Sequence, residues 1–257
     1  MRLAHMTWPQ AEEYFKNNDT VILSVGSIEC HGKHNPLGTD TLIPMKLLAL
    51  IEERKDTLIL PTLPYGDCDY FLGFPGSVSI GSDLLRETVK RICDSLYPWG
   101  ARRFVMLNGH GGNTHALEQV CRYLDGKGAV GVIINWWVTA GEINPVWKGG
   151  HGAGQETSAV LAIDPALVDK DAITETDESH DPTENIKYSS LRFGSFKGVD
   201  VILPRSIRKM TDNGWYGKDH PKTATEEWGK EMLDATADFI AELLDEIKNL
   251  PLEGEEK

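Results

Sequence analysis

The stretch from Val25 to Asp40, VGSIECHGKHNPLGTD, concentrates side chains that can bind metal ions or transfer protons. Glu29, His31, His34 and Asp40 follow directly after an apolar run that is typical of a buried strand. Carboxylates and imidazoles are ligands of Zn²⁺, Mn²⁺ and Fe²⁺, and they also serve as general acids and bases. The stretch therefore indicates a metal site or an acid/base site at the end of a strand.

The spacing within this stretch separates the side chains into two sets. Glu29 and His31 are two residues apart, so in an extended segment they point to the same side, while Cys30 points away. Asp40 ends the loop at the start of a predicted helix, where a carboxylate can also cap the helix.

Two later stretches carry the same kinds of side chain. His110 lies in NGHGGN directly after the predicted strand RFVML, and HGAGQETS, which begins at His151 and includes Glu156, follows the predicted strand VIINWW. In an open parallel sheet, sites form outside the carboxyl ends of the strands, so we expect the three stretches to meet there.

The candidate ligands together are three carboxylates and two imidazoles, a mixed set that suits Zn, Mn or Fe(II) better than Ca²⁺. Two such ions lie about 3.5–4 Å apart in hydrolytic sites and can activate a shared water. The set comprises Glu29, His31, Asp40, His110 and Glu156.

Each of these residues also has an ordinary structural interpretation. Asp40 could be only a helix cap, Glu29 could pair with Lys33 or Lys46, and Glu156 could be an acidic residue in a first helical turn. The coincidence of all the candidates in loops that leave strands favours the functional interpretation.

The elements that must position these side chains alternate between strands and helices up to about residue 165, which is typical of a parallel sheet with helices on both faces. We expect strands at 20–27, 57–66, 103–108 and 129–137, helices at 41–54, 82–100, 114–128 and 223–250, and a short strand at 199–204 within an irregular region, 170–220. Ser82 is the expected cap of the second helix, and Asn113 or Thr114 that of the third.

The bulk properties narrow the classes of function. A chain of 257 residues is expected to form a single α/β domain over residues 1–250, with a flexible tail at 251–257. The net charge of −13 argues against a nucleic-acid partner. We expect no membrane span and no secretory signal, and we interpret the four scattered cysteines as reduced thiols of a cytoplasmic protein.

The three stretches together resemble the creatininase (creatinine amidohydrolase) family. GSIECHGKHNPLGTD is similar to the family's first motif, NGHGGN to the second and HGAGQETS to the third. The late segment NGWYGKDHPKTATEEWG is similar to a fourth, with His220 inserted between Asp219 and Pro221. The resemblance covers residues 1 to about 245.

This resemblance implies a three-layer α/β/α domain with a mostly parallel sheet, a binuclear metal centre and a homo-oligomer, often a hexamer. Carried over by position, Glu29, Asp40 and His110 match the ligands of one divalent ion. His31, Asp40 and a glutamate match those of the other.

The source of that glutamate is where the sequence departs from creatininase itself. In creatininase itself, this glutamate lies two residues after the histidine of the second motif, where this chain has Gly112. Relatives with NGHGGN take it from the third motif, which assigns Glu156. The resemblance makes His151 the residue that protonates the leaving group, and we expect His34 to orient a ligand.

The resemblance implies a metal-dependent hydrolase in which activated water attacks a carbonyl of a small cyclic amide or formamide, with His151 and Glu156 as the catalytic residues. One alternative is C–C cleavage of a cyclic diketone of the 3-dehydro-scyllo-inosose type. An alternative of another class is a metal-free structural or binding paralogue. Trp136, Trp137 and Trp147 could line the pocket or pack in the core.

Overall fold

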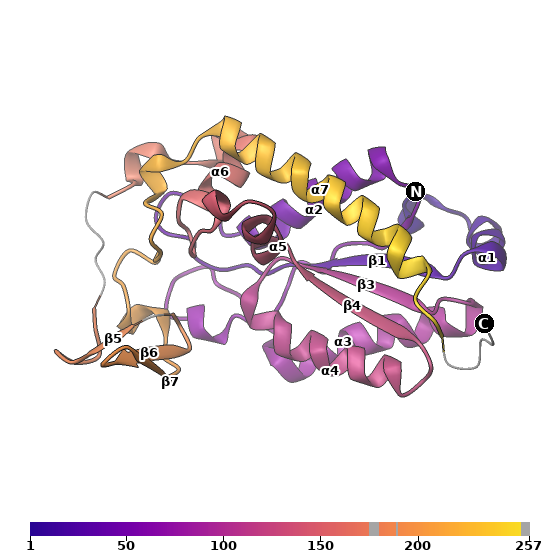
Figure 1. Cartoon of the computed structure of the whole chain (residues 1–257), viewed down its shortest axis with the longest axis horizontal. Helices are drawn as coiled ribbons and strands as arrows, with labels where there is room; N and C mark the ends of the chain where they lie inside the picture. Colours follow the sequence, from indigo (N-terminus) through magenta and orange to yellow (C-terminus); the bar gives the residue numbers. More distant parts are fainter. Residues whose placement is uncertain (175–179, 189, 253–257) are drawn as a thin grey trace.

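A computed structural model describes residues 1–174, 180–188 and 190–252, and its centre is a four-stranded parallel sheet (Figure 1). The strand order is β2-β1-β3-β4, and each neighbouring pair is parallel. The strands are β1 (Thr20–Val25), β2 (Leu58–Ile59), β3 (Arg103–Asn108) and β4 (Val130–Asn135). The predicted α/β fold with a mostly parallel sheet is confirmed.

Helices cover both faces of this sheet and complete the three layers (Figure 1). One face carries α2 (Thr39–Arg54), α5 (Trp136–Ile143), α6 (Gly154–Ile163) and α7 (Glu226–Lys248). The other carries α1 (Trp8–Asn17), α3 (Gly81–Leu96) and α4 (Thr114–Asp125).

The strand sequences explain why two cores form. Every residue of β1 and β3 is buried, as expected for parallel strands that are covered on both faces. Alternate side chains enter opposite cores: Ile22 and Val105 pack with α2, while Val21 and Phe104 pack with α3 and α4. This double packing fixes the strand ends, and hence the loops that leave them.

Three predicted helix starts are wrong by a short distance, including that of the closing helix, which is predicted from residue 223 and begins at Glu226. The helix α2 begins at Thr39, so Asp40 lies in its first turn, and Gly38 occupies the cap position. The helix α3 begins at Gly81, so Ser82 lies inside the helix and does not cap it. Asp40 is therefore free of a capping role.

The prediction of a strand through residue 137 is also wrong. The strand β4 ends at Asn135, and Trp136 and Trp137 begin α5. An apolar run alone does not distinguish a buried strand from a buried helix. The helix α1 was not predicted at all.

The irregular region contains a second, antiparallel sheet in the order β5-β6-β7. Its strands are β5 (Ile186–Tyr188), β6 (Phe193–Phe196) and β7 (Val199–Ile202), and only β7 was predicted. Lys197 and Gly198 both have positive φ, which is the two-residue turn that suits the twist of a hairpin. Most of the predicted tail, residues 253–257, lies outside the described residues.

Two predictions from the bulk properties can be compared with the described residues. No helix among them is long and apolar enough to span a bilayer. All four cysteines are free, and Cys30, Cys68 and Cys93 are buried.

Candidate metal centre

The five predicted ligands meet at the carboxyl ends of β1 and β3 and at the start of α6. They form two overlapping groups that share Asp40, namely Glu29–Asp40–His110 and His31–Asp40–Glu156. In each group, one donor atom from every residue lies within 4.8 Å of the others. Residues that are 127 positions apart in the chain are thus brought to one point by the sheet.

The distances between the donor atoms are equal to, or a few tenths of an ångström shorter than, those around a tetrahedral ion. Asp40 Oδ1 lies 2.9 Å from His31 Nε2, and Asp40 Oδ2 lies 2.9 Å from His110 Nδ1. Glu29 Oε1 is 3.1 Å from His110 Nδ1, and Glu156 Oε2 is 3.6 Å from His31 Nε2. Donor atoms around a tetrahedral ion with bonds of 2.0–2.2 Å lie roughly 3.3–3.6 Å apart.

Two buried carboxylate oxygens test whether the residues fit a cation. Glu29 Oε1 and Asp40 Oδ2 both face His110 Nδ1, yet neither makes a hydrogen bond of acceptable geometry with any described residue. A buried carboxylate oxygen without a partner is costly. A divalent cation would satisfy both oxygens, so the donor set fits a metal ion.

The electrostatics of the cluster point the same way. Burial alone would lower the pKa of His31, but the charges of Asp40 and Glu156 outweigh it and raise that pKa to about 10. Burial would likewise lower the pKa of His110, but Glu29 and Asp40 outweigh this effect and raise that pKa well above its usual value. Burial raises the pKa of Glu156 to about 7. The three carboxylates therefore create a strong demand for positive charge.

Backbone carbonyls orient the histidines. His31 Nδ1 lies 3.1 Å from the carbonyl of Glu29, and His110 Nε2 lies 2.9 Å from that of Asp67. A ring N–H that donates to a carbonyl leaves the other nitrogen free to bind a metal, which is the usual support for a histidine ligand. In both residues the free nitrogen is the one that faces Asp40.

Glycines and an asparagine bring the loops into contact. A Cβ at Gly109 would lie 1.9 Å from the carbonyl oxygen of Asp40, and one at Gly26 would lie 2.3 Å from Thr41 Oγ1. The Asn113 side chain donates to the Gly26 carbonyl and accepts from the Asp67 N–H. Asn113 therefore ties the strand exits together. It occupies the predicted cap position of α4, but its side chain makes no capping hydrogen bond to that helix.

The position of the missing second-motif glutamate has no room for a side chain. A Cβ at Gly112 would lie 2.1 Å from the Asp67 carbonyl oxygen and 2.5 Å from His110 Nε2. That carbonyl is the group that orients His110. Glu156 instead approaches His31 from the first turn of α6, as predicted from the third motif.

Glu156 is held by its own loop. Gly152 has a φ of 62°, and its N–H donates to Glu156 Oε2 over 2.6 Å. A Cβ at Gly152 would lie 2.8 Å from the carbonyl carbon of His31. Glycine at position 152 thus allows this loop to contact the first motif.

His151 lies beside these two groups and forms a third group of possible metal donors with Glu29 and His31. Its Nε2 is 2.6 Å from the Cys30 carbonyl, which leaves Nδ1 facing Glu29 Oε1 at 3.8 Å. The ring packs between Phe71, at 4.5 Å between centroids, and Tyr216, at 5.5 Å. Burial holds the pKa of His151 well below its usual value.

His34 and Cys30 point away from the cluster. His34 Nε2 lies 3.1 Å from the hydroxyl of Thr157, the neighbour of Glu156, and burial lowers the pKa of His34 to about 4. Cys30 packs in a small apolar group with Cys68 and Phe71. The predicted alternation of Glu29, Cys30 and His31 is thus observed.

The three tryptophans pack in the core. Trp136 is fully buried among residues of α2, α6 and α7, and Trp137 and Trp147 pack against the same cluster.

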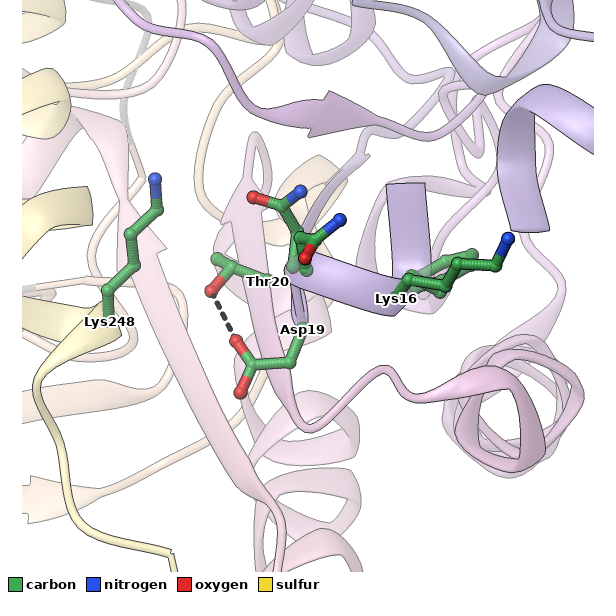
Figure 2. A pocket seen from close by; sticks show the side chains of 7 residues that line it. Lys16, Asp19, Thr20 and Lys248 are labelled. Carbon is green, nitrogen blue, oxygen red and sulfur yellow. Dashed lines mark hydrogen bonds between the residues drawn. The ribbon is translucent and has the colours of Figure 1, made fainter. Parts of the chain in front are cut away.

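One cavity is remote from the candidate residues. It has a volume of about 380 Å³ and lies at the amino end of β1, lined by Phe15–Thr20 and Lys248. Figure 2 shows Lys16 and Lys248 on either side of it, and the Thr20 hydroxyl donates a hydrogen bond to the Asp19 carboxylate. The candidate centre lies at the other end of the same strand.

Sequence reasoning did not assign a role to Asp67, Tyr216 or Asp219. Asp67 acts through its carbonyl, which leaves no signature in residue type. Tyr216 and Asp219 lie in the fourth motif, so the signal for them was present.

Comparison with known proteins gives consistent results. A family model, Creatininase (creatinine amidohydrolase), matches residues 4–244. A mycofactocin precursor peptide peptidase of Mycolicibacterium smegmatis is 34% identical, with 86% of this chain and 83% of that protein covered. A creatinine amidohydrolase of Pseudomonas putida is 28% identical, with 95% and 96% covered. A manganese form of creatininase superposes with a TM-score of 0.73 at 26% identity, covering 95% of this chain and 97% of that one.

Proposed function

The chain is a metal-dependent hydrolase of the creatininase family, and on this premise we propose that it hydrolyses the C–N bond of a small cyclic amide or formamide. The observation that carries the proposal is the pair of donor groups that share Asp40. Cleavage of a C–N amide bond is the chemistry that the names of both the creatinine amidohydrolase and the peptidase relative imply.

The proposed centre holds two divalent ions, Zn, Mn or Fe. Glu29, Asp40 and His110 would hold one, and His31, Asp40 and Glu156 the other. Such ions polarise a carbonyl and lower the pKa of water so that hydroxide is available near neutral pH. Asp40, in the first turn of α2, fixes the spacing between the groups because each of its oxygens faces a different histidine.

His151 is the proposed proton carrier. Its Nε2–H is committed to the Cys30 carbonyl, so Nδ1, which faces the cluster, is the atom that accepts and returns a proton. The ring can take a proton from the attacking water and deliver it to the departing nitrogen. Phe71 and Tyr216 pack against the ring and restrict its orientation.

The burial of the cluster supports a small substrate. The Glu29 and His31 side chains are fully buried, and Glu156, the most exposed of the five ligand candidates, is only 11% exposed. This burial favours a small molecule or a chain end as the substrate over the middle of a folded polypeptide.

A substrate panel tests the proposal. Protein freed of metal with a chelator and reloaded with Zn²⁺ or Mn²⁺ is offered cyclic amides including creatinine, formamides and a cyclic diketone, with the His110→Ala variant as the inactive control. We expect metal-dependent opening of a cyclic amide to the corresponding ring-opened acid, or release of an amine and formate from a formamide. Inertness to every amide, with cleavage of the diketone, would replace C–N by C–C hydrolysis and leave the metal centre in place.

A second candidate substrate is a peptide bond near a chain end. The 34% identity to a mycofactocin precursor peptide peptidase favours it. Short peptides with free termini belong in the same panel, and cleavage of these but not of cyclic amides would select this candidate.

We also propose a homo-oligomer, such as a hexamer, in the cytoplasm. The small sheet supports association because Val199 and Ile202 of β7 are 64% and 69% exposed. Light scattering on the purified protein measures the oligomer size, and a monomer at micromolar concentration would contradict the proposal. Cell fractionation tests the location.

A further inference from the structure

The loop that carries His151 and leads to Glu156 is fastened at both ends by one distant residue, Asp219. The Gly150 N–H donates to Asp219 Oδ1 over 2.9 Å, and the Gln155 N–H donates to Oδ2 over 2.8 Å. The Gly154 N–H also donates to the backbone carbonyl of Asp219, over 3.0 Å.

Glycines make this contact possible. A Cβ at Gly149 would lie 2.5 Å from Asp219 Oδ2, and a Cβ at Gly217 would lie 3.0 Å from Oδ1. The carboxylate is thus enclosed by bare backbone on two sides. Asp219 also supplies acceptors to the N-terminal turn of α6, where an anion is favoured by the helix dipole.

Neighbouring residues extend the same contact. Tyr216, three residues before Asp219, donates its N–H to the His151 carbonyl over 2.9 Å and stacks its ring on that of His151. The segment 216–219 therefore holds the loop on which His151 lies and from which α6 starts.

We propose that Asp219 is a positioning residue of the candidate metal centre, which holds His151 and Glu156 against the ligands contributed by the loops after β1 and β3. The inference rests on the proposed function, because it assigns a role within that centre. Asp219 is not a member of either donor group, and it acts through the backbone of the loop.

The inference predicts an asymmetric effect on the two metal groups. The His31–Asp40–Glu156 group depends on the loop through Glu156, whereas the Glu29–Asp40–His110 group is drawn from other segments. An asparagine at 219 has a single acceptor atom and no charge, so it can accept from Gly150 or from Gln155 but not from both through oxygen. Loss of Asp219 should weaken the binding of one ion and leave the binding of the other unchanged.

The test is a titration of the metal-free protein with Zn²⁺ by calorimetry, supported by the absorption spectrum of bound Co²⁺. We compare the wild type with Asp219→Asn and Asp219→Ala. The control is Asp164→Ala, because Asp164 also accepts a backbone N–H, that of Ala166, at the other end of α6. In the Asp219 variants one ion should bind about 10–100-fold more weakly, the usual effect of removing a group that supports a ligand.

Two reference variants identify the affected ion. The Co²⁺ signal lost in the Asp219 variants should be the one lost in Glu156→Gln and not the one lost in Glu29→Gln. A purely structural role would weaken both ions together. Circular dichroism checks folding, and Asp219→Asn carries the test if Asp219→Ala does not fold.

The inference is overturned if the Asp219 variants bind both ions within about twofold of the wild-type affinity, or lose both equally. A wild type that binds no ion refutes the proposed function together with this inference. A wild type that binds two ions, with unchanged Asp219 variants, refutes the inference alone.

Discussion

Replacing Asp40 with asparagine should remove the stabilisation that both metal ions provide. Asp40 is the residue that the two donor groups share, and each of its oxygens lies 2.9 Å from a different histidine. Of the two groups that share Asp40, Glu29→Gln and Glu156→Gln each change one only. The side-chain shape is nearly preserved in all three variants, so the comparison isolates the number of ions affected.

The magnitude follows from linkage between binding and folding. At a metal concentration of 100 times Kd, each ion stabilises the folded state by about 2.7 kcal/mol, so two ions contribute ~5.4 kcal/mol. If loss of a ligand weakens the binding of an ion ~100-fold, that ion then contributes ~0.4 kcal/mol to stability. The stabilisation by bound metal should therefore fall to ~0.8 kcal/mol in Asp40→Asn and to ~3.1 kcal/mol in each single-group variant.

The assay is the thermal unfolding of each protein with and without Zn²⁺. For a domain of this size each kcal/mol corresponds to roughly 2–4 °C, so the wild type should gain ~11–22 °C and Asp40→Asn only ~2–3 °C. The loss in Asp40→Asn should equal the sum of the losses in Glu29→Gln and Glu156→Gln. A loss in Asp40→Asn no larger than that in one single-group variant would refute the sharing of Asp40.

The other predictions concern individual side chains. His151→Ala should lower kcat by about 10²–10⁴ with unchanged metal content by elemental analysis; a fall in metal content would make His151 a ligand, as the third donor group with Glu29 and His31 allows. Gly109→Ala places a Cβ 1.9 Å from a carbonyl oxygen and should cost more than about 2 kcal/mol in chemical denaturation. Its control, Gly126→Ala, meets only contacts of 3.7 Å and should change stability by less than about 1 kcal/mol. Trp136→Ala should cost about 3–5 kcal/mol without altering metal stoichiometry, and a selective loss of activity at unchanged stability would contradict its core position.

The parallel sheet was predictable because its strands carry the information themselves. Most residues of β1 and β3 are apolar, and the observed bounds of β3 match the prediction. The start of α5 was not predictable in this way, because a short, mostly apolar run such as IINWW is compatible with a buried helix as well as with a buried strand. The hairpin of β6 and β7 turns at Lys197 and Gly198, a pair that lacks the usual Asn-Gly or Asp-Gly signal.

The meeting of the candidate ligands was also predictable, because strand ends on one edge of a parallel sheet converge. What holds them was less visible. The support of His110 comes from a backbone carbonyl at Asp67, and that of the His151 loop comes from backbone N–H groups that donate to Asp219. Backbone partners depend on the folded path of the chain, so residue type alone does not reveal them.

The most direct test of the account is the number of divalent ions that the purified protein binds. Elemental analysis for Zn, Mn and Fe, followed by titration of the metal-free protein, should give two ions per chain in the wild type and a loss of both in Asp40→Ala. Well under one equivalent of these metals, with Asp40→Ala unchanged from the wild type, would contradict the metal centre and favour a metal-free structural or binding protein.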